Sequence, residues 1–244
     1  MKLPTAITKT AEFLLGFVYP KRCVLCNAFT NNNACFLCSL CTEQLEIIRY
    51  PVCPVCGASV SKDGKCSSCR GKLEYLERNI SFLVYDDVTK DLIKRFKYDR
   101  LYNIGRDIVR LMLSQEDAEN RLEFFSEIDL FVPIPLHESK LRSRGFNQAE
   151  IISKALSAGL KIPENADIIR RVRETTPQSL VPATARKSNV SGSFGIAKNV
   201  PEDVNKICII DDIYTSGNTI NECAKVLLEN GAKSVCSFTI ARAL

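Results

Sequence analysis

The length and composition of this chain are those of an ordinary folded protein. It has 244 residues, of which 45% are hydrophobic and 25% are charged. This balance excludes a disordered chain and allows one full-sized core with a smaller appended domain. The formal net charge is +5, which is too small to indicate nucleic-acid binding by itself.

The start of the chain contains its longest early apolar stretch, at residues 13–19. A membrane-spanning helix needs roughly 20 apolar residues, and no small-residue cleavage site follows the stretch, so we expect a cytoplasmic protein. The apolar residues around it fall on one helical face, which packs on the protein itself or rests on the inner face of the membrane. They are Leu3, Ile7, Leu14 and Val18.

Cysteines are concentrated in the next part of the chain, where nine of the twelve lie between residues 23 and 69. Eight of them form C-x-x-C pairs, whose spacing turns both sulfurs toward one metal ion, so that two pairs complete a tetrahedral site. We predict two structural Zn2+ sites without an open position for catalysis. Each would carry a net charge of about −2, which lowers the net charge of the chain to about +1. The ligands are Cys23, Cys26, Cys38, Cys41, Cys53, Cys56, Cys66 and Cys69.

The grouping of these cysteines has open alternatives. Sequential use of the pairs gives one site within 23–41 and the other within 53–69, whereas an interleaved arrangement would mix them. Cys35 could replace Cys41 beside Cys38, although we expect Cys35 to be a spare thiol. A disulfide framework would need an oxidising compartment, for which the sequence supplies no export signal.

Strand and helix signals alternate after about residue 79. We therefore predict a first domain at 1–79, with an N-terminal helix and a double zinc ribbon, and a second domain at 80–244. The expected strands are 79–87, 128–135, 206–213 and 234–243, and the expected helical segments are 88–114, 147–160 and 217–232. Such alternation predicts an α/β fold, with a parallel sheet covered by helices on both faces.

Two acids and a polar loop follow the apolar strand predicted at 206–213. Ligands of parallel sheets bind at the carboxyl ends of the strands, and the backbone N–H groups at a helix N-terminus favour a phosphate. Carboxylates accept hydrogen bonds from paired hydroxyls and can hold a hydrated Mg2+ ion. The segment therefore predicts a site for a molecule with a phosphate about one sugar away from a vicinal diol. Its residues are Asp211, Asp212, Thr215, Ser216, Gly217, Asn218 and Thr219.

The string IIDDIYTSGNT, at 209–219, resembles the phosphoribosyl pyrophosphate (PRPP) motif of type I phosphoribosyltransferases. The resemblance implies a type I phosphoribosyltransferase-like sheet and Mg2+ bound with PRPP. It also implies that Asp211 and Asp212 hold the ribose 2′ and 3′ hydroxyls, while the loop surrounds the 5′-phosphate. Purine-salvage members carry a carboxylate base where this sequence has Thr215. Transfer to a 6-oxopurine is therefore disfavoured, and a transferase with another acceptor or a protein without catalysis stays open.

The order of motifs along nearly the whole chain is similar to that of the ComF/GntX family, bacterial proteins associated with natural competence. The motifs are the cysteine head, FKY at 96–98, VPIPLHESKLRSRGFNQAE at 132–150, TTPQSL at 175–180, RKSNVSGSF at 186–194 and the PRPP motif. The resemblance implies a role in transformation and DNA uptake, with PRPP as ligand and other competence or recombination proteins as partners. It also places four basic residues on the pyrophosphate side of the site: His137, Lys140, Arg142 and Arg144.

A second hypothesis is an accessory protein that binds single-stranded DNA and uses PRPP or a nucleotide as a signal. Basic residues with aromatic residues between them bind single strands through phosphate contacts and base stacking. The pattern comprises Lys90, Lys94, Arg95, Phe96, Lys97, Tyr98 and Arg100, with a further group at Arg170, Arg171 and Arg173. Lys94, Arg95 and Lys97 are the principal candidates. The plainer interpretation assigns Phe96 to an apolar helical face and the basic residues to a solvated one.

Overall fold

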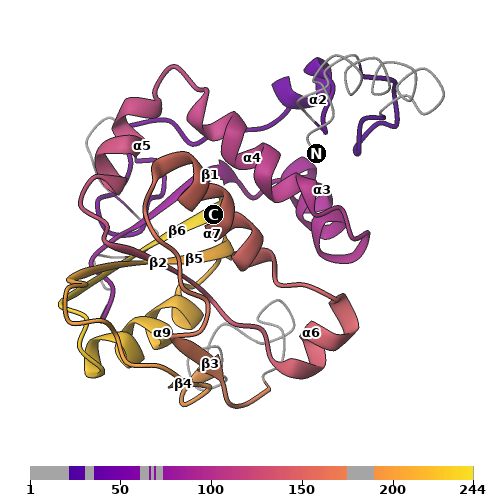
Figure 1. Ribbon diagram of the computed structural model, residues 1–244. Coiled ribbons are helices and arrows are strands. Elements are labelled where there is room, and N and C mark those ends of the chain that lie inside the picture. Colours follow the sequence, from indigo (N-terminus) through magenta and orange to yellow (C-terminus); the bar gives the residue numbers. More distant parts are fainter. Residues whose placement is uncertain are drawn as a thin grey trace, which may run out of the picture. The chain divides into compact units, whose positions relative to one another are not determined.

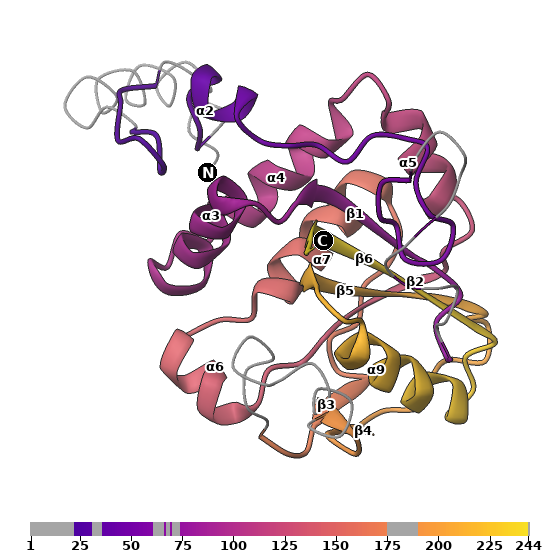
Figure 2. The ribbon, with the colours of Figure 1, turned by 180° about the vertical axis from the view of Figure 1, so that it is seen from behind.

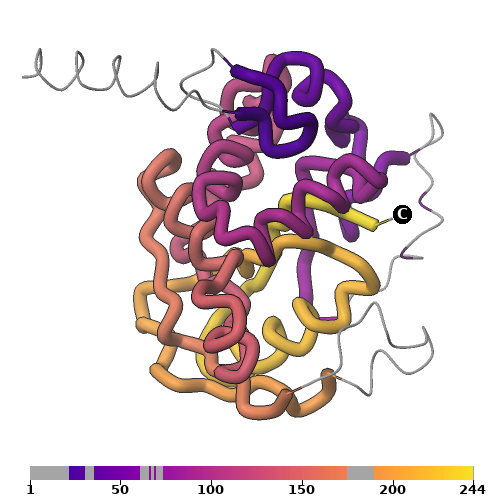
Figure 3. The backbone as a smooth tube through the Cα atoms, turned by 90° about the vertical axis from the view of Figure 1, so that its right-hand side faces the viewer, coloured from indigo at the N-terminus to yellow at the C-terminus, as the bar shows by residue number. Residues whose placement is uncertain are grey.

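A four-stranded parallel sheet lies at the centre of residues 46–244 in the computed structural model (Figure 1). Its strands are β1 (Asn79–Val84), β2 (Leu130–Pro133), β5 (Lys206–Tyr214) and β6 (Ser234–Arg242), in the order β1-β6-β5-β2. β6 therefore runs between β1 and β5, and its yellow tube leads to the C-terminus in Figure 3. Because all four strands are parallel, their carboxyl ends share one edge of the sheet.

Helices cover both faces of this sheet (Figure 2). α7 (Gln148–Leu160) packs on β2 and β5, and α9 (Asn218–Glu229) packs on β5 and β6 from the other side. Successive side chains of a strand point to opposite faces, so Ile207 and Ile209 of β5 share a core with α9. This arrangement confirms the predicted parallel sheet with helices on both faces.

The structure describes residues 22–30, 36–60, 66, 69, 74–174 and 190–243. The predicted N-terminal helix with its apolar face, the thiol Cys35 and the TTPQSL segment lie outside these residues, as does the first half of RKSNVSGSF. Within the described ranges, we find no helix long and apolar enough to span a bilayer. Packing divides the chain into compact units at 1–45 and 46–244, and the first unit contains the short helix α2 (Ser39–Glu43).

Residues 46–60 pack with the sheet. Ile48 N donates a hydrogen bond to Phe82 O at 2.9 Å. The buried side chain of Asn79 donates to Cys56 O at 3.2 Å. These contacts join the second group of cysteines to β1, whereas the sequence pattern places that segment in a first domain at 1–79. The predicted division of the chain into independent domains stays a prediction.

The helical stretch predicted at 88–114 consists of two helices, α3 (Asp87–Tyr98) and α4 (Asn103–Leu113). The Asp86 side chain caps the start of α3 by accepting a hydrogen bond from Thr89 N, the backbone N–H of the third helical residue. The break between the helices includes Arg100, whose φ of 56° lies in the left-handed region that a helix cannot continue through.

Several short elements were not predicted. They are α5 (Ala118–Phe125), α6 (Glu138–Arg144) and the antiparallel pair of β3 (Ile169–Arg171) and β4 (Phe194–Ile196). α6 has only seven residues and no buried side chain, so no apolar stripe marks it in the sequence. β3 contains two arginines among its three residues, which hides its strand character.

Candidate functional site

A cavity of about 550 Å³ lies where the end of β5 meets its following loop. Its walls come from α3, α6, the start of α7, β3 and the loop that leads from β5 into α9. Two acids and a larger set of basic residues line it, and the volume is within the usual range for small-molecule sites. The charged lining residues are Lys90, Lys94, Lys97, Lys140, Arg144, Arg171, Asp211 and Asp212.

Both acids of the motif line the cavity at the carboxyl end of β5. Asp212 N donates a hydrogen bond to Asp211 Oδ1 at 2.8 Å, and Lys97 Nζ lies 2.7 Å from Asp212 Oδ2. Burial raises the pKa of Asp211 to about 7, and the neighbouring Asp212 charge acts in the same direction against Lys97 and Arg171. The carboxyl group of Asp211 therefore changes its protonation state near neutral pH, while Lys97 balances the charge of Asp212.

The loop after the acids presents Thr215, Gly217 and Thr219 to the cavity. Gly217 has a φ of 75° and caps α9, where its carbonyl accepts a hydrogen bond from Asn221 N at 2.8 Å. A Cβ atom on Gly217 would collide with the Tyr214 hydroxyl and lie 2.7 Å from Tyr214 Cζ. Glycine is therefore required here, both for its backbone conformation and for space.

Ser216 and Asn218 are the other two residues of the predicted phosphate loop. Neither is among the described residues that line the cavity. Asn218 is the first residue of α9. Their predicted contact with a phosphate stays a prediction.

Lys140 and Arg144 bring two of the four predicted pyrophosphate-side residues to the cavity. Arg171 joins them from β3, whereas the sequence pattern assigns it only to a DNA-binding group. Burial lowers the pKa of Lys140, and the charge of Arg171 lowers it further. Cations that repel one another in a partly buried site favour an anionic ligand, which relieves the repulsion.

His137 and Arg142 have other surroundings on α6. His137 caps the helix, with Nδ1 accepting a hydrogen bond from Ser139 N at 3.3 Å. Arg142 is exposed and lies 3.3 Å from Glu138 in an ion pair. Neither lines the cavity among the described residues, and their role at a pyrophosphate stays a prediction.

The RGFNQ segment at 144–148 joins α6 and α7 to the sheet. Asn147 is buried, and its Nδ2 donates to Ile134 O, just beyond β2, at 2.9 Å. The ring of Phe146 packs against Phe96 with centroids 5.9 Å apart. These contacts hold Arg144 at the cavity, which gives the RGFNQ segment a structural role at the site.

The DNA-binding candidates on α3 have different surroundings. Lys94 and Lys97 line the cavity, and Lys97 is paired with Asp212. Arg95 is paired with Asp91 at 2.9 Å on the helix surface. Two of the three principal candidates therefore face the same cavity as the acids.

The two aromatic residues of the same segment have opposite surroundings. Phe96 is fully buried, as the plainer interpretation of the sequence expected. Tyr98 is 67% exposed and lines the cavity, and the Arg144 guanidinium lies 5.4 Å from the centre of its ring. Tyr98 alone of the pair can offer a stacking surface.

The eight paired cysteines form two tetrads in sequential order. Their ligand atoms lie within 4.8 Å of one another in each tetrad. Sγ–Sγ separations of 3.7 Å in both tetrads match the edge of about 3.8 Å expected for four sulfurs at about 2.3 Å from zinc. They are far longer than the roughly 2.05 Å of a disulfide. The first tetrad is Cys23, Cys26, Cys38 and Cys41, and the second tetrad is Cys53, Cys56, Cys66 and Cys69.

Comparison with known proteins gives one family match to the cysteine-rich N-terminal region and several relatives that match most of the chain. Residues 14–71 match the family described as a double zinc ribbon domain. Competence protein ComFC of Bacillus subtilis is 30% identical over 245 residues, covering 93% of this chain and 97% of that protein. Competence protein F of Haemophilus influenzae is 29% identical, covering 91% and 97%. DNA utilization protein YhgH of Escherichia coli is 28% identical, covering 92% and 98%.

Solved structures with some likeness to this chain include two phosphoribosyltransferases. A purine phosphoribosyltransferase from Pyrococcus horikoshii is 16% identical, with a TM-score of 0.32, covering 58% of this chain and 83% of that chain. An adenine phosphoribosyltransferase is 18% identical, with a TM-score of 0.35, covering 62% and 75%.

Proposed function

The chain belongs to the ComF family of competence proteins, and from that premise we propose that it binds PRPP with Mg2+ in the cavity at the end of β5. We place its action in the cytoplasm, in the handling of DNA during transformation, with other competence or recombination proteins as partners. The names of its relatives, which refer to competence and DNA utilization, support that setting.

The observation that carries the PRPP proposal is the charge pattern of the cavity. Two acids stand beside a glycine loop at one end of β5, and cations from three other elements face them. PRPP has the complementary pattern, with a vicinal diol, one phosphate beyond the ribose and a pyrophosphate on its other side. Asp211 and Asp212 would accept hydrogen bonds from the diol, since ionised carboxylates are acceptors only.

The phosphate groups would occupy the two basic parts of the cavity. The loop of Thr215, Gly217 and Thr219 precedes α9, whose N-terminal N–H groups and dipole favour a 5′-phosphate. Lys140 and Arg144 are suited to the pyrophosphate, because charge-assisted hydrogen bonds to phosphate are strong. Arg171 would reinforce them from β3.

Mg2+ would enter as a complex with PRPP. Oxygen ligands suit this ion, and the carboxylates of Asp211 and Asp212 can hold its water molecules. Lys97 Nζ lies 2.7 Å from Asp212 Oδ2, so this carboxylate already has a cationic partner and would not need to bind the ion directly. The phosphates of PRPP would therefore supply most of the direct Mg2+ ligands.

Replacing Asp211 or Asp212 with Ala is expected to weaken Mg2+-dependent PRPP binding more than tenfold, because hydrogen bonds to charged groups contribute about 1.5–3 kcal/mol each. Isothermal titration calorimetry would measure the affinity. Asp167→Ala is the matched control, because this acid is exposed and paired with Lys198 at 2.6 Å. Unchanged affinity in both site variants would overturn the assignment of the diol site.

PRPP affinity is also expected to fall as the pH is lowered below about 7. Asp211 must be ionised to accept hydrogen bonds from both hydroxyls of the diol. Its pKa is raised from the ordinary 3.8 to about 7, so a growing fraction is protonated below that pH. The affinity should therefore fall by up to about tenfold per pH unit below 7. PRPP phosphates titrate in the same range, so the measure is the difference between the natural protein and Asp211→Asn. Equal pH slopes in both proteins would contradict the role of Asp211.

Turnover would need an acceptor for the ribosyl group. Thr215 cannot serve as the carboxylate base expected for a 6-oxopurine acceptor, so we propose a different acceptor or a binding function without transfer. Pyrophosphate release from PRPP, followed across a panel of amines and nucleobases, separates these two possibilities. Release with one acceptor would identify an enzyme, and no release with any acceptor would favour a sensor.

Binding of single-stranded DNA is a second candidate, favoured by the exposed Tyr98 at the rim of the basic cavity. Base stacking on an aromatic side chain contributes about 1–3 kcal/mol. Tyr98→Ala and Lys94→Glu should each weaken binding of a fluorescent oligonucleotide, and the affinity should fall steeply with salt. Lys233→Glu, on an exposed turn outside the cavity, is the charge-matched control. Salt-independent binding, or equal loss in the control, would remove this candidate.

A further inference from the structure

A buried arginine lies between the second tetrad and the phosphate loop. Arg242, at the end of β6, is only 1% exposed. Its Nη2 donates a hydrogen bond to Cys56 Sγ at 3.2 Å. Its guanidinium carbon lies 4.7 Å from the centre of the Tyr214 ring. One side chain therefore contacts both a zinc ligand and the last residue of β5.

Tyr214 extends this contact to the loop. Tyr214 is buried and stands opposite Arg242 in the register of β5 and β6. Its ring lies so close to Gly217 that no Cβ atom would fit between them. The position of the Tyr214 ring therefore limits how closely the loop at Gly217 can approach the sheet. It thereby sets the direction of the backbone N–H groups of that loop.

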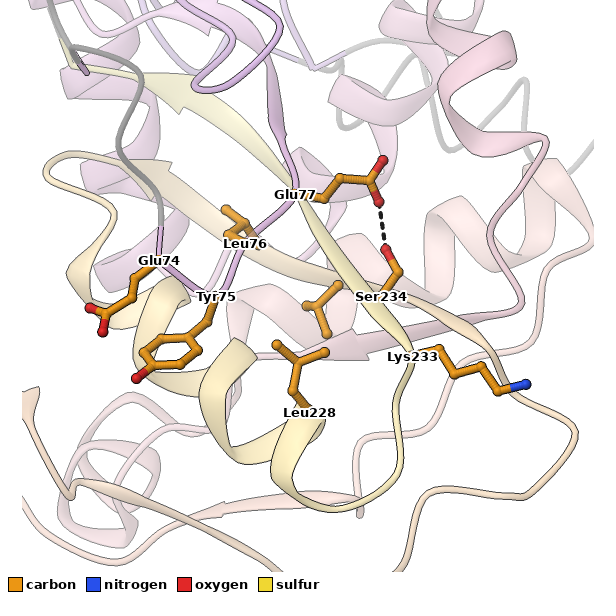
Figure 4. Close-up of a pocket in the computed structure, with 8 residues that line it drawn as sticks. Glu74, Tyr75, Leu76, Glu77, Leu228, Lys233 and Ser234 are labelled. Atoms are coloured by element: carbon orange, nitrogen blue, oxygen red, sulfur yellow. Dashed lines mark hydrogen bonds between the residues drawn. The ribbon is translucent and has the colours of Figure 1, made fainter.

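A second connection runs from the tetrad to the start of α9. The segment at 74–77 follows the last cysteine ligand and passes along α9 and the start of β6 (Figure 4). Tyr75 N donates a hydrogen bond to Asn221 Oδ1, in the first turn of α9, at 3.0 Å. Lys225 Nζ lies 6.0 Å from the centre of the Tyr75 ring. The start of α9 is thus held by Tyr75, and its N-terminal cap Gly217 lies against the Tyr214 ring.

The charge of Arg242 makes the first connection dependent on the metal. A buried guanidinium is strongly destabilising unless anions lie close to it. Four thiolates on one Zn2+ ion carry a net charge of about −2, and Cys56 is the thiolate that Arg242 contacts. Zinc bound to the second tetrad would therefore fix Cys56 Sγ at the guanidinium beside the Tyr214 ring, and loss of zinc would leave that sulfur free to move away.

We propose that Arg242 is a positioning residue, through which zinc in the second tetrad sets the affinity of the phosphate loop for PRPP. This proposal rests on the proposed function. Because coupling between two binding sites is reciprocal, PRPP must raise the zinc affinity of the second tetrad by the same factor. The coupling should be lost when Arg242 is replaced, whereas a coupling that runs only through overall stability would be kept.

The experiment measures both directions of the coupling in the full chain. Chelator competition gives the zinc affinity of each tetrad with and without Mg2+ and PRPP, and calorimetry gives PRPP affinity before and after loss of the second zinc. We expect a change of roughly tenfold in each direction at the second tetrad. The first tetrad, which belongs to the other compact unit, should show no change with PRPP.

Substitution of Arg242 tests the connection itself. Arg242→Gln should abolish the PRPP effect on zinc affinity and weaken PRPP binding roughly tenfold, and Arg242→Lys should restore part of both. Arg121→Gln is the matched control, because Arg121 is a second buried arginine, 2.9 Å from Ile48 O, and does not line the described cavity. Metal analysis and thermal melting confirm that each variant is folded with two zinc ions.

The possible outcomes separate the inference from the proposed function. Failure of the natural protein to bind PRPP would remove the proposed function, and this inference with it. PRPP binding without any effect on zinc affinity would overturn the inference alone. Equal loss of PRPP affinity in Arg242→Gln and Arg121→Gln would also overturn it, because general destabilisation would then explain both.

Discussion

Replacing Cys53 with Ser should leave the chain with one zinc ion and lower the melting temperature of the sheet unit on the order of 10 °C. Cys53 and Cys56 are buried in the same core as β2, β5 and α9, so the second tetrad is part of the packing of the sheet. A ligand present at 1,000 times its dissociation constant stabilises a fold by about 4 kcal/mol. In a domain of this size, each kcal/mol shifts the melting temperature by about 2–4 °C.

The control for this prediction is the same change in the first tetrad. Cys26→Ser should also leave one zinc ion, but Cys26 is an exposed member of the unit at 1–45. Circular dichroism of the helical signal during heating measures the sheet unit in both variants, and metal analysis counts the zinc. A similar fall in melting temperature in the two variants would contradict a specific role of the second tetrad in the sheet unit.

Features with a local sequence signal were predicted well. The C-x-x-C spacing is enough to identify the zinc ligands, because both sulfurs of a pair must turn around one short loop. The apolar run at 206–213 predicts β5, since strands buried on both faces have no alternation of polar residues. The segment at 234–243, which we predict as the last strand, forms β6. The position of Asp211 and Asp212 at the end of the first run then places them at the edge of the sheet.

Features that depend on packing between distant segments were missed. The ion pair of Lys97 with Asp212, more than a hundred residues away in the chain, has no signal in the sequence, and the predicted contact of Lys97 with DNA stays a prediction. Arg171 reaches the cavity only because β3 pairs with β4, and neither strand has an apolar pattern long enough to predict it. No local rule brings these residues together.

Arg242 shows which sequence signal could have been used. It is the one charged residue of the buried strand β6, and charged residues are almost never fully buried unless an anion accompanies them. That observation predicts a partner for Arg242 without identifying it. The thiolate of Cys56 is identified only by the fold, which places the second tetrad beside the end of β6.

Replacing Gly217 with Ala should weaken PRPP binding roughly a hundredfold, which corresponds to about 2.7 kcal/mol. The φ of 75° costs a residue with a Cβ atom about 1–2 kcal/mol. The added methyl group would also collide with the Tyr214 ring, at 2.7 Å from Cζ. The loop at Gly217 must therefore move away from β5. Calorimetric titration with PRPP and Mg2+ measures the loss.

Gly192→Ala separates the effect of backbone strain from the effect of the collision with the Tyr214 ring. Gly192 has a φ of 64°, in the same region, but a Cβ atom there would meet nothing within 4 Å. This variant should therefore lose stability by about 1–2 kcal/mol and keep its PRPP affinity. Backbone strain alone would be the cause if both variants lost affinity equally.

The collision can be tested by a double substitution. Tyr214→Ala removes the ring that Gly217→Ala would meet, so the two changes should be less damaging together than the sum of their separate effects on PRPP affinity. Strict additivity would mean that the ring does not limit the loop. Unchanged affinity in Gly217→Ala itself would move the phosphate away from this loop and leave Asp211 and Asp212 without their expected neighbour.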